Sequence, residues 1–442
     1  MQERGLSEFK SFSGYLQTGG NNIPIIFSAR INRSGEVEFD FGTIALTQET
    51  LFIMKYWQDE FFSLSGQSPD GIEFKTEDLQ FTSLKHESGE KIGSRMSPIG
   101  GCTRAEFRRK QLEPVPKPIL RLNIKGFQNY PRLSAKCCLG TVIMDGRTSI
   151  ADPDIITGHI SVYSDNEPTD LSAWRMEADK FLEHLRRIMS FASASMLQAP
   201  ILEFYAGENL EVAALSQNRQ SPALMHTFHY LNQQPVFDAA VMSFFNPPFK
   251  VNNLFFAIEW FAMDATYSEV RLVNAMTVLE NLVAANLGDD DVMIRPSKEF
   301  KNIRRTLRQV IKKCVAKWSA EESEKAKEVE VELNDKLVDL NRRSIFQKLK
   351  ILAKRWHVPL DGISDDKIKA AKKVRDLIVH RGHYYEEGKE KTDDLWEHVS
   401  VVRELVVRFI LTAIGFKGSY FSYLGGYHEA QFPPQADVSK AN

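Results

Sequence analysis

The sequence predicts an α+β protein, with a β-rich, sandwich-like N-terminal part followed by an all-α helical bundle. Before about residue 165 the apolar residues form short alternating runs typical of strands, and after about residue 250 they recur every three or four positions, as in amphipathic helices. A length of 442 residues also exceeds what one compact core usually holds. We expect a β-rich domain over 1–168, a mixed segment packing on it over 169–250, an α-helical domain over 251–426 and a flexible tail over 427–442.

Composition narrows the class of protein. The formal net charge of -2 excludes a surface that is basic throughout, although it allows a local basic patch. The cysteines form no C-x-x-C pair, which favours a reduced, cytoplasmic protein. No segment approaches the roughly 18 to 20 uninterrupted apolar residues of a membrane span, and the N-terminus lacks the apolar core of a signal peptide. We therefore expect no membrane association.

The strand-like runs of the N-terminal part are bounded by turn residues, and they indicate a β-sandwich or a strongly curved sheet. Between them, 88–117 is rich in Gly, Ser, Pro and basic residues without a steady period, so it is expected to be a long loop. The predicted strands are 24–32, 36–46, 71–84, 118–127, 137–146 and 155–164. The aromatic residues here are expected to belong to the core, and His159 to be a structural histidine on a strand.

A helical period begins at 171 and continues to 193. Two short strands, PILEFYAG and LEVAALS, are expected to follow it and return to the sheet. Helices with short connectors then predict a bundle. They are expected over 253–286, 298–318, 321–357, 365–381 and 393–414.

The helix predicted over 365–381 ends within the stretch VRDLIVHRGHYYEE. Ser364 is a suitable N-cap and Gly382 a suitable C-cap, which places His380 in the last helical turn. Arg375 lies five residues earlier, about 140° around the helix axis. The two side chains therefore diverge on one helix, yet both can border a groove between two helices or two subunits.

A histidine and an arginine are sufficient, without a metal or other cofactor, to cleave RNA through its own 2′-hydroxyl. His380 would remove the 2′-OH proton, and Arg375 would stabilise the charged phosphorane, leaving a 2′,3′-cyclic phosphate. This mechanism requires RNA and excludes DNA. The spacing alone is weak, because Arg-x4-His is expected by chance about 0.6 times in such a chain. A surface helix end with two solvated side chains is the alternative.

The context of this spacing resembles a HEPN domain, a helical bundle whose metal-independent ribonucleases carry R-polar-x3-H at a helix end. The matching residues are Arg375, Asp376 and His380 in RDLIVH. A β-rich half joined to such a bundle also resembles the ApeA-like anti-phage proteins, which act by abortive infection. The resemblance implies an RNA-cleaving homodimer in which two motifs face each other across one cleft, with Asp376 positioning Arg375.

The same resemblance implies cellular or phage RNA as the substrate and a phage-derived trigger that releases restraint by the N-terminal half. One departure concerns regulation. HEPN toxins that are silenced by nucleotidyl transfer to tyrosine carry R-x4-H-x-Y, but this chain has Gly382 at the tyrosine position. We therefore do not expect that modification. The remaining alternative is a non-catalytic HEPN-like protein that binds RNA or a nucleotide or serves assembly.

Further residues are candidates for supporting roles. Glu280 could orient Arg375 through a charge-assisted hydrogen bond, as acids of an early bundle helix do in some HEPN proteins; a half-exposed helix glutamate is the alternative. The basic segment RPSKEFKNIRRTLRQVIKKCVAKW could follow RNA phosphates beside the cleft or form a solvated helix face. The candidate RNA-binding residues are Arg304, Arg305, Arg308, Lys312 and Arg381.

His383 is a second possible supporting residue. Together with His380, Asp376 and two glutamates at 386 and 387, it has the H-x2-H spacing of some metal sites. The helix is expected to break between the two histidines, and no second ligand pair is present. We therefore predict no metal site.

Overall fold

The structure is a computed structural model, and it divides into two compact units at Phe245. The first unit is Met1–Phe245 and the second is Asn246–Asn442. The described residues are 6–18, 20–45, 61–89, 93–127, 131–146, 152–218, 225–263, 265, 267–317, 323–385 and 394–434.

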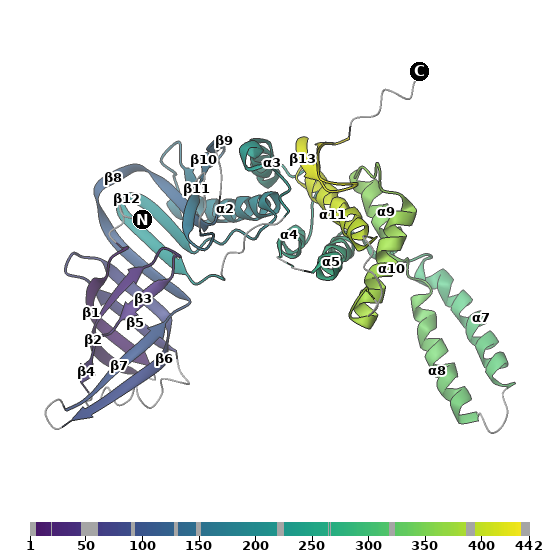
Figure 1. Cartoon of the computed structure of the whole chain (residues 1–442), viewed down its shortest axis with the longest axis horizontal. Helices are drawn as coiled ribbons and strands as arrows, with labels where there is room; N and C mark the ends of the chain where they lie inside the picture. Colours follow the sequence, from purple (N-terminus) through teal and green to yellow (C-terminus); the bar gives the residue numbers. More distant parts are fainter. Residues whose placement is uncertain are drawn as a thin grey trace, which may run out of the picture. The chain divides into compact units, whose positions relative to one another are not determined.

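The described residues of the first unit contain a 12-stranded antiparallel sheet (Figure 1). Its order is β3-β2-β1-β5-β6-β8-β11-β10-β9, with β12 on β8, β7 on β6 and β4 on β7. The strands are β1 (Lys10–Thr18), β2 (Asn21–Ile31), β3 (Val37–Asp40), β4 (Ile44–Ala45), β5 (Phe62–Gln67), β6 (Glu73–Gly89), β7 (Gly93–Gly101), β8 (Arg104–Lys125), β9 (Leu133–Cys137), β10 (Gly140–Asp145), β11 (Ile156–Tyr163) and β12 (Ile201–Leu215). All twelve strands belong to one hydrogen-bonded sheet, so a strongly curved sheet describes this unit better than two stacked sheets.

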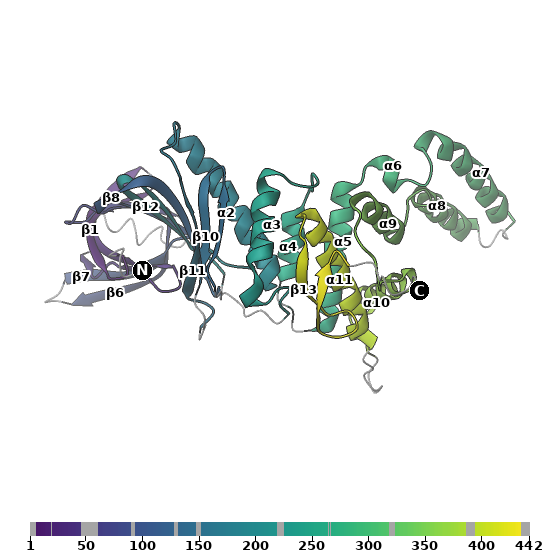
Figure 2. The same cartoon turned by 90° about the horizontal axis from the view of Figure 1, so that it is seen from above.

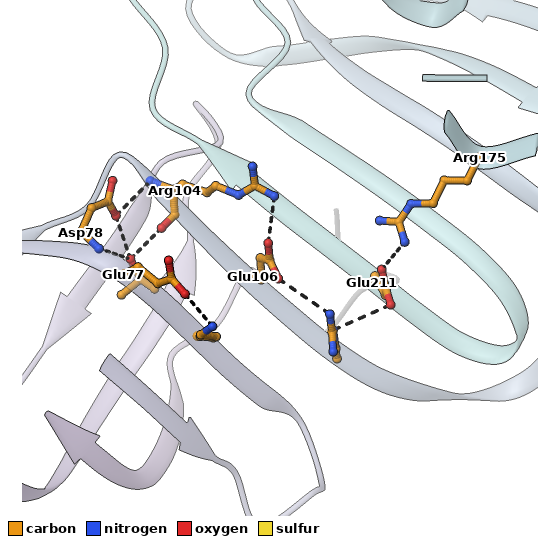
Figure 3. A network of polar contacts seen from close by, with 9 residues as sticks. Glu77, Asp78, Arg104, Glu106, Arg175 and Glu211 are labelled. Carbon is orange, nitrogen blue, oxygen red and sulfur yellow. Dashed lines mark hydrogen bonds and ion pairs between the residues drawn. The ribbon is translucent and has the colours of Figure 1, made fainter. Parts of the chain in front are cut away.

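The prediction of a long loop over 88–117 is wrong. This stretch contains the end of β6, all of β7 and the first half of β8. Ala105 and Phe107 of β8 point into the core, whereas Arg104 and Glu106 lie on the outer face, 2.8 Å apart (Figure 3). Arg104 and Arg108, two of the basic residues that obscured the period, therefore lie on the ion-paired outer side of a strand.

The helix predicted over 171–193 is confirmed as α2 (Leu171–Ser193), with Asp170 accepting a hydrogen bond from the backbone N–H of Ala173. It packs on β8 and β11, and α3 (Gln234–Phe245) packs against it (Figure 1). The two short strands expected after α2 are one strand, β12, in which register shifts at Gly207 absorb the turn-forming residues.

The described part of the second unit is mainly helical. Its elements are α4 (Leu254–Ala262), α5 (Ser268–Asn286), α6 (Asp289–Val292), α7 (Ser297–Val315), α8 (Ser323–Asp339), α9 (Ile345–Trp356), α10 (Asp365–Arg381), α11 (Asp394–Ala413), β13 (Gly418–Ser422) and β14 (His428–Phe432). None of the helices within the described ranges is both long and apolar enough to span a membrane.

Two helices that the sequence analysis treated as continuous are broken. The segment 253–286 is split into α4 and α5 because Met263 adopts an extended backbone. The segment 321–357 is split into α8 and α9. Between them, the side chain of Asn341 accepts a hydrogen bond from the backbone N–H of Arg295 at 3.0 Å and donates one to the carbonyl of Arg295 at 2.9 Å. Ser344 then begins α9 with a capping box to Gln347.

The prediction of a flexible tail over 427–442 is wrong for its first part, because β14 pairs with β13 in a hairpin. Gly425 and Gly426 have positive φ angles at its turn, which other residues rarely adopt. Buried Glu404 of α11 holds the hairpin, accepting hydrogen bonds from the side chains of Tyr420 and Ser422. The residues after 434 lie outside the described part.

Candidate functional site

The candidate site lies on α10, whose two predicted caps are confirmed. The Ser364 side chain accepts a hydrogen bond from the backbone N–H of Lys367. Gly382 takes the left-handed conformation, with φ of 82°, and its N–H donates to the carbonyl of Ile378 at 2.7 Å. The buried side of α10 packs against α5 and α11. His380 and Arg381 therefore occupy the last helical turn.

Arg375 is held by two carboxylates. Its Nη2 group donates to Glu280 of α5, and its Nη1 group donates to Asp376 at 3.1 Å. The side chain of Arg375 is 19% exposed, and those of Glu280 and Asp376 are 34% and 33% exposed. Its Nε–H is buried without a hydrogen-bond partner in the described part of the chain. The guanidinium is thus fixed from two helices, and its buried Nε–H is left without an acceptor among the described residues.

Asp376 has a second cationic neighbour that the sequence analysis missed. Lys372, one turn earlier on α10, donates to its carboxylate. Burial alone would raise the pKa of Asp376, but the hydrogen bond from Lys372 and the charges of Lys372 and Arg375 hold it below the usual range. The carboxylate stays ionised at neutral pH. The i, i+4 spacing of these residues was the available signal.

His380 is exposed and makes no hydrogen bond or ion pair with any described residue. Arg381 beside it is also exposed. His383 lies beyond the cap, with its Nδ1 atom 2.8 Å from the carbonyl oxygen of Tyr385. Glutamates 386 and 387 lie outside the described residues. No group of three potential metal ligands occurs among the residues that the structure does describe.

The candidate RNA-binding residues of α7 are separated from Arg375 in this chain. Figures 1 and 2 show α7 and α8 as a hairpin that projects away from α5, α10 and α11. Arg305, Arg308 and Lys312 are exposed, Arg304 is half-buried, and none of the four forms an ion pair with a described residue. The basic helix is therefore a separate surface within one chain, and its position beside a cleft formed by two chains stays a prediction.

The chemistry available at α10 is that of an anchored cation and a free imidazole on one helix. A fixed guanidinium can stabilise charge on a phosphate, and an exposed histidine can transfer a proton. Comparison with protein-family models, with curated proteins and with solved structures gives no match for this chain. The HEPN and ApeA-like resemblances therefore remain expectations, based on the motif and the general architecture.

Proposed function

We propose that the protein is a metal-independent endoribonuclease that cleaves RNA by attack of the 2′-hydroxyl, leaving a 2′,3′-cyclic phosphate. His380 is the general base and acid, Arg375 stabilises the scissile phosphate, and Asp376 and Glu280 position Arg375. The observation that carries the proposal is the ion pair of Arg375 with Glu280 and Asp376, on the helix whose last turn exposes His380.

The site is completed by a second copy of the chain. Arg375 and His380 diverge on one α10 helix, so a homodimer that faces two such helices supplies a histidine from one subunit and an arginine from the other. In the cell such an activity fits an anti-phage, abortive-infection role, in which the N-terminal unit restrains cleavage until a phage-derived trigger arrives. This biological role rests on the family resemblance alone.

The direct test incubates the purified full chain with RNA in excess chelator and analyses the product ends. Cyclic-phosphate ends that disappear in His380→Ala and Arg375→Ala support the proposal. Cleavage that requires an added divalent cation would instead point to metal-dependent hydrolysis.

A second candidate is a non-catalytic protein that binds RNA through α7. Arg305, Arg308 and Lys312 of that helix are exposed and form no ion pair with a described residue, which favours this candidate because phosphate binding requires no chemistry. Measuring both RNA binding and RNA cleavage, for wild type and for His380→Ala, distinguishes the two functions. A catalytic protein loses cleavage and keeps its affinity, whereas a binding protein shows no cleavage in either form.

A further inference from the structure

The solvent side of α10 carries a row of basic residues that ends at His380. Successive residues of a helix are about 100° apart, so Lys369, Lys373 and His380 lie within about 40° of one another around the axis. All three side chains are exposed. The buried residues Ala371 and Ile378 lie on the opposite side, which packs on α5 and α11. The row therefore faces away from the bundle.

The spacing of the row suits a nucleic-acid strand. Lys369 and Lys373 are one turn apart, and His380 lies about two turns further along. At about 1.5 Å per residue, these steps are about 6 and 10.5 Å along the axis. Lysine side chains are long and flexible, so the two lysines can each reach a different phosphate of one strand. A strand whose reacting phosphate lies at His380 and that runs toward the start of α10 therefore passes both lysines.

The charges of both lysines are available to an anion. Lys373 forms no ion pair with a described residue, and Lys369 lies 3.4 Å from Asp366, whose side chain is 94% exposed. An ion pair this exposed contributes little, so a phosphate can replace the carboxylate. A contact from α9 also restrains Lys369, whose Nζ lies 5.3 Å from the centre of the Phe346 ring.

The acid on the same side of α10 is already neutralised. Asp376 follows Lys373 in the row and precedes His380, and its carboxylate contacts both Lys372 and Arg375. Two cations against one carboxylate leave a net positive charge at this point. An RNA phosphate that approaches His380 along the row is therefore attracted and not repelled.

Another lysine of the same helix lies outside the row. Lys367 is about 160° around the axis from Lys369, and its Nζ lies 3.9 Å from the carboxylate of Glu397 on α11. The basic helix α7 projects away from α10 (Figures 1 and 2). Lys369 and Lys373 are therefore the exposed cations that share one side of α10 with His380.

We propose that Lys369 and Lys373 are substrate-positioning residues, which bind two phosphates of the RNA strand on one side of the cleaved bond. The inference rests on the proposed ribonuclease function and gives the substrate a direction, from His380 along α10 toward Phe346 of α9. Substrate length should then affect cleavage, because an RNA too short to reach the lysines gains no binding energy from them.

The first test measures binding without cleavage. The full chain is titrated at several salt concentrations with an RNA of about ten nucleotides that carries 2′-O-methyl groups throughout and so cannot react. Lys369→Gln and Lys373→Gln are each expected to lower the slope of log Kobs against log salt by about 0.7. Lys367→Gln is the matched control on the same helix and should leave the slope unchanged. An unchanged slope in both test variants would overturn the proposal, whether or not the protein cleaves RNA.

The second test fixes the cleaved bond. A DNA strand with a single ribonucleotide has one 2′-hydroxyl, so it can be cut at one bond only, and the deoxynucleotides on either side are lengthened stepwise. Lengthening on one side should raise kcat/KM about tenfold or more in wild type but not in the Lys369→Gln, Lys373→Gln double variant. Equal gains in the two proteins would contradict the positioning role. A reduced salt slope without cleavage of any strand would refute the ribonuclease function, and the positioning role with it, and would identify the row as a binding surface.

Discussion

Glu280 of α5 accepts a hydrogen bond from Nη2 of Arg375 on α10, and this contact links the candidate motif to the rest of the bundle. Asp376 holds the Nη1 group of the same guanidinium at 3.1 Å. The arginine is therefore positioned from two sides before any substrate binds. In the proposed mechanism this preorganisation lets Arg375 meet the charge that develops on the phosphate.

Glu280→Gln is expected to lower the rate of RNA cleavage about 10- to 100-fold, because a guanidinium displaced by about 1 Å loses its alignment with the phosphate. The loss should fall on kcat, with the melting temperature little changed, since Glu280 is 34% exposed. Glu269→Gln, in the first turn of the same helix, is the matched control. A variant with wild-type kcat would show that Glu280 does not position Arg375 for cleavage.

Mixing two inactive variants should restore activity if the site is shared by two chains. In a heterodimer of Arg375→Ala and His380→Ala, one composite site receives both wild-type residues, so random exchange should recover about a quarter of the wild-type rate in a two-fold symmetric dimer. The measurement is cleavage after subunit exchange, with size-exclusion chromatography as the control for dimer formation. Dimers that exchange but remain inactive would place both residues of each site in one chain.

Neutralising α7 should weaken RNA binding and flatten its salt dependence. Replacing Arg304, Arg305 and Arg308 by glutamine is expected to reduce the slope of log Kobs against log salt by about 2 for single-stranded RNA. Lys325→Gln with Lys327→Gln on exposed α8 positions is the control. If the salt slope stays the same in the triple variant, α7 is a solvated face and not an RNA-binding surface.

Acid should destabilise the first unit through His184. Burial lowers its pKa from the ordinary 6.5 to about 4, and its Nε2 atom lies 3.1 Å from both the Ala240 carbonyl and the Ser243 hydroxyl. Below pH 6.5 the unfolded chain takes up a proton at this histidine, whereas the folded chain does so only at about pH 4. The contribution of neutral His184 to the free energy of unfolding is therefore complete above pH 6.5 and is lost as the pH falls toward 4. The loss by pH 5 is about 2 kcal/mol.

Urea unfolding at pH 7.5 and pH 5 tests this linkage. His184→Gln should be less stable than wild type at pH 7.5 and should lose less stability on acidification, because glutamine does not titrate. Equal losses in the two proteins would assign the acid sensitivity to other groups.

The sequence was most informative where local signals and burial agree. For α10, the Ser364 cap, the Gly382 cap and the apolar residues between them predicted the observed helix. The same holds for α2, where the apolar period is regular over its whole length. In both cases the residues that end the element and the residues that bury it lie close together in the sequence.

Prediction failed where distant residues decide the structure. The first half of β8 was predicted to be a loop because the partners of its charged residues, such as Glu211, come from a strand that follows about a hundred residues later. The break at Asn341 depends on the backbone of Arg295, and the folding of β14 depends on its pairing with β13. The ion pair of Arg375 with Glu280 was a candidate contact, but only the packing of α5 on α10 brings the two side chains together.

The most direct test of the central claim compares cleavage of RNA and of DNA with the same sequence, under single-turnover conditions in excess chelator, by wild type and His380→Ala. We predict that wild type cuts only the RNA, leaving 2′,3′-cyclic phosphate ends, and that His380→Ala is slower by about 100-fold or more, the usual contribution of general acid–base catalysis. Cleavage of the DNA at the same rate, or wild-type cleavage of RNA by His380→Ala, would contradict the mechanism.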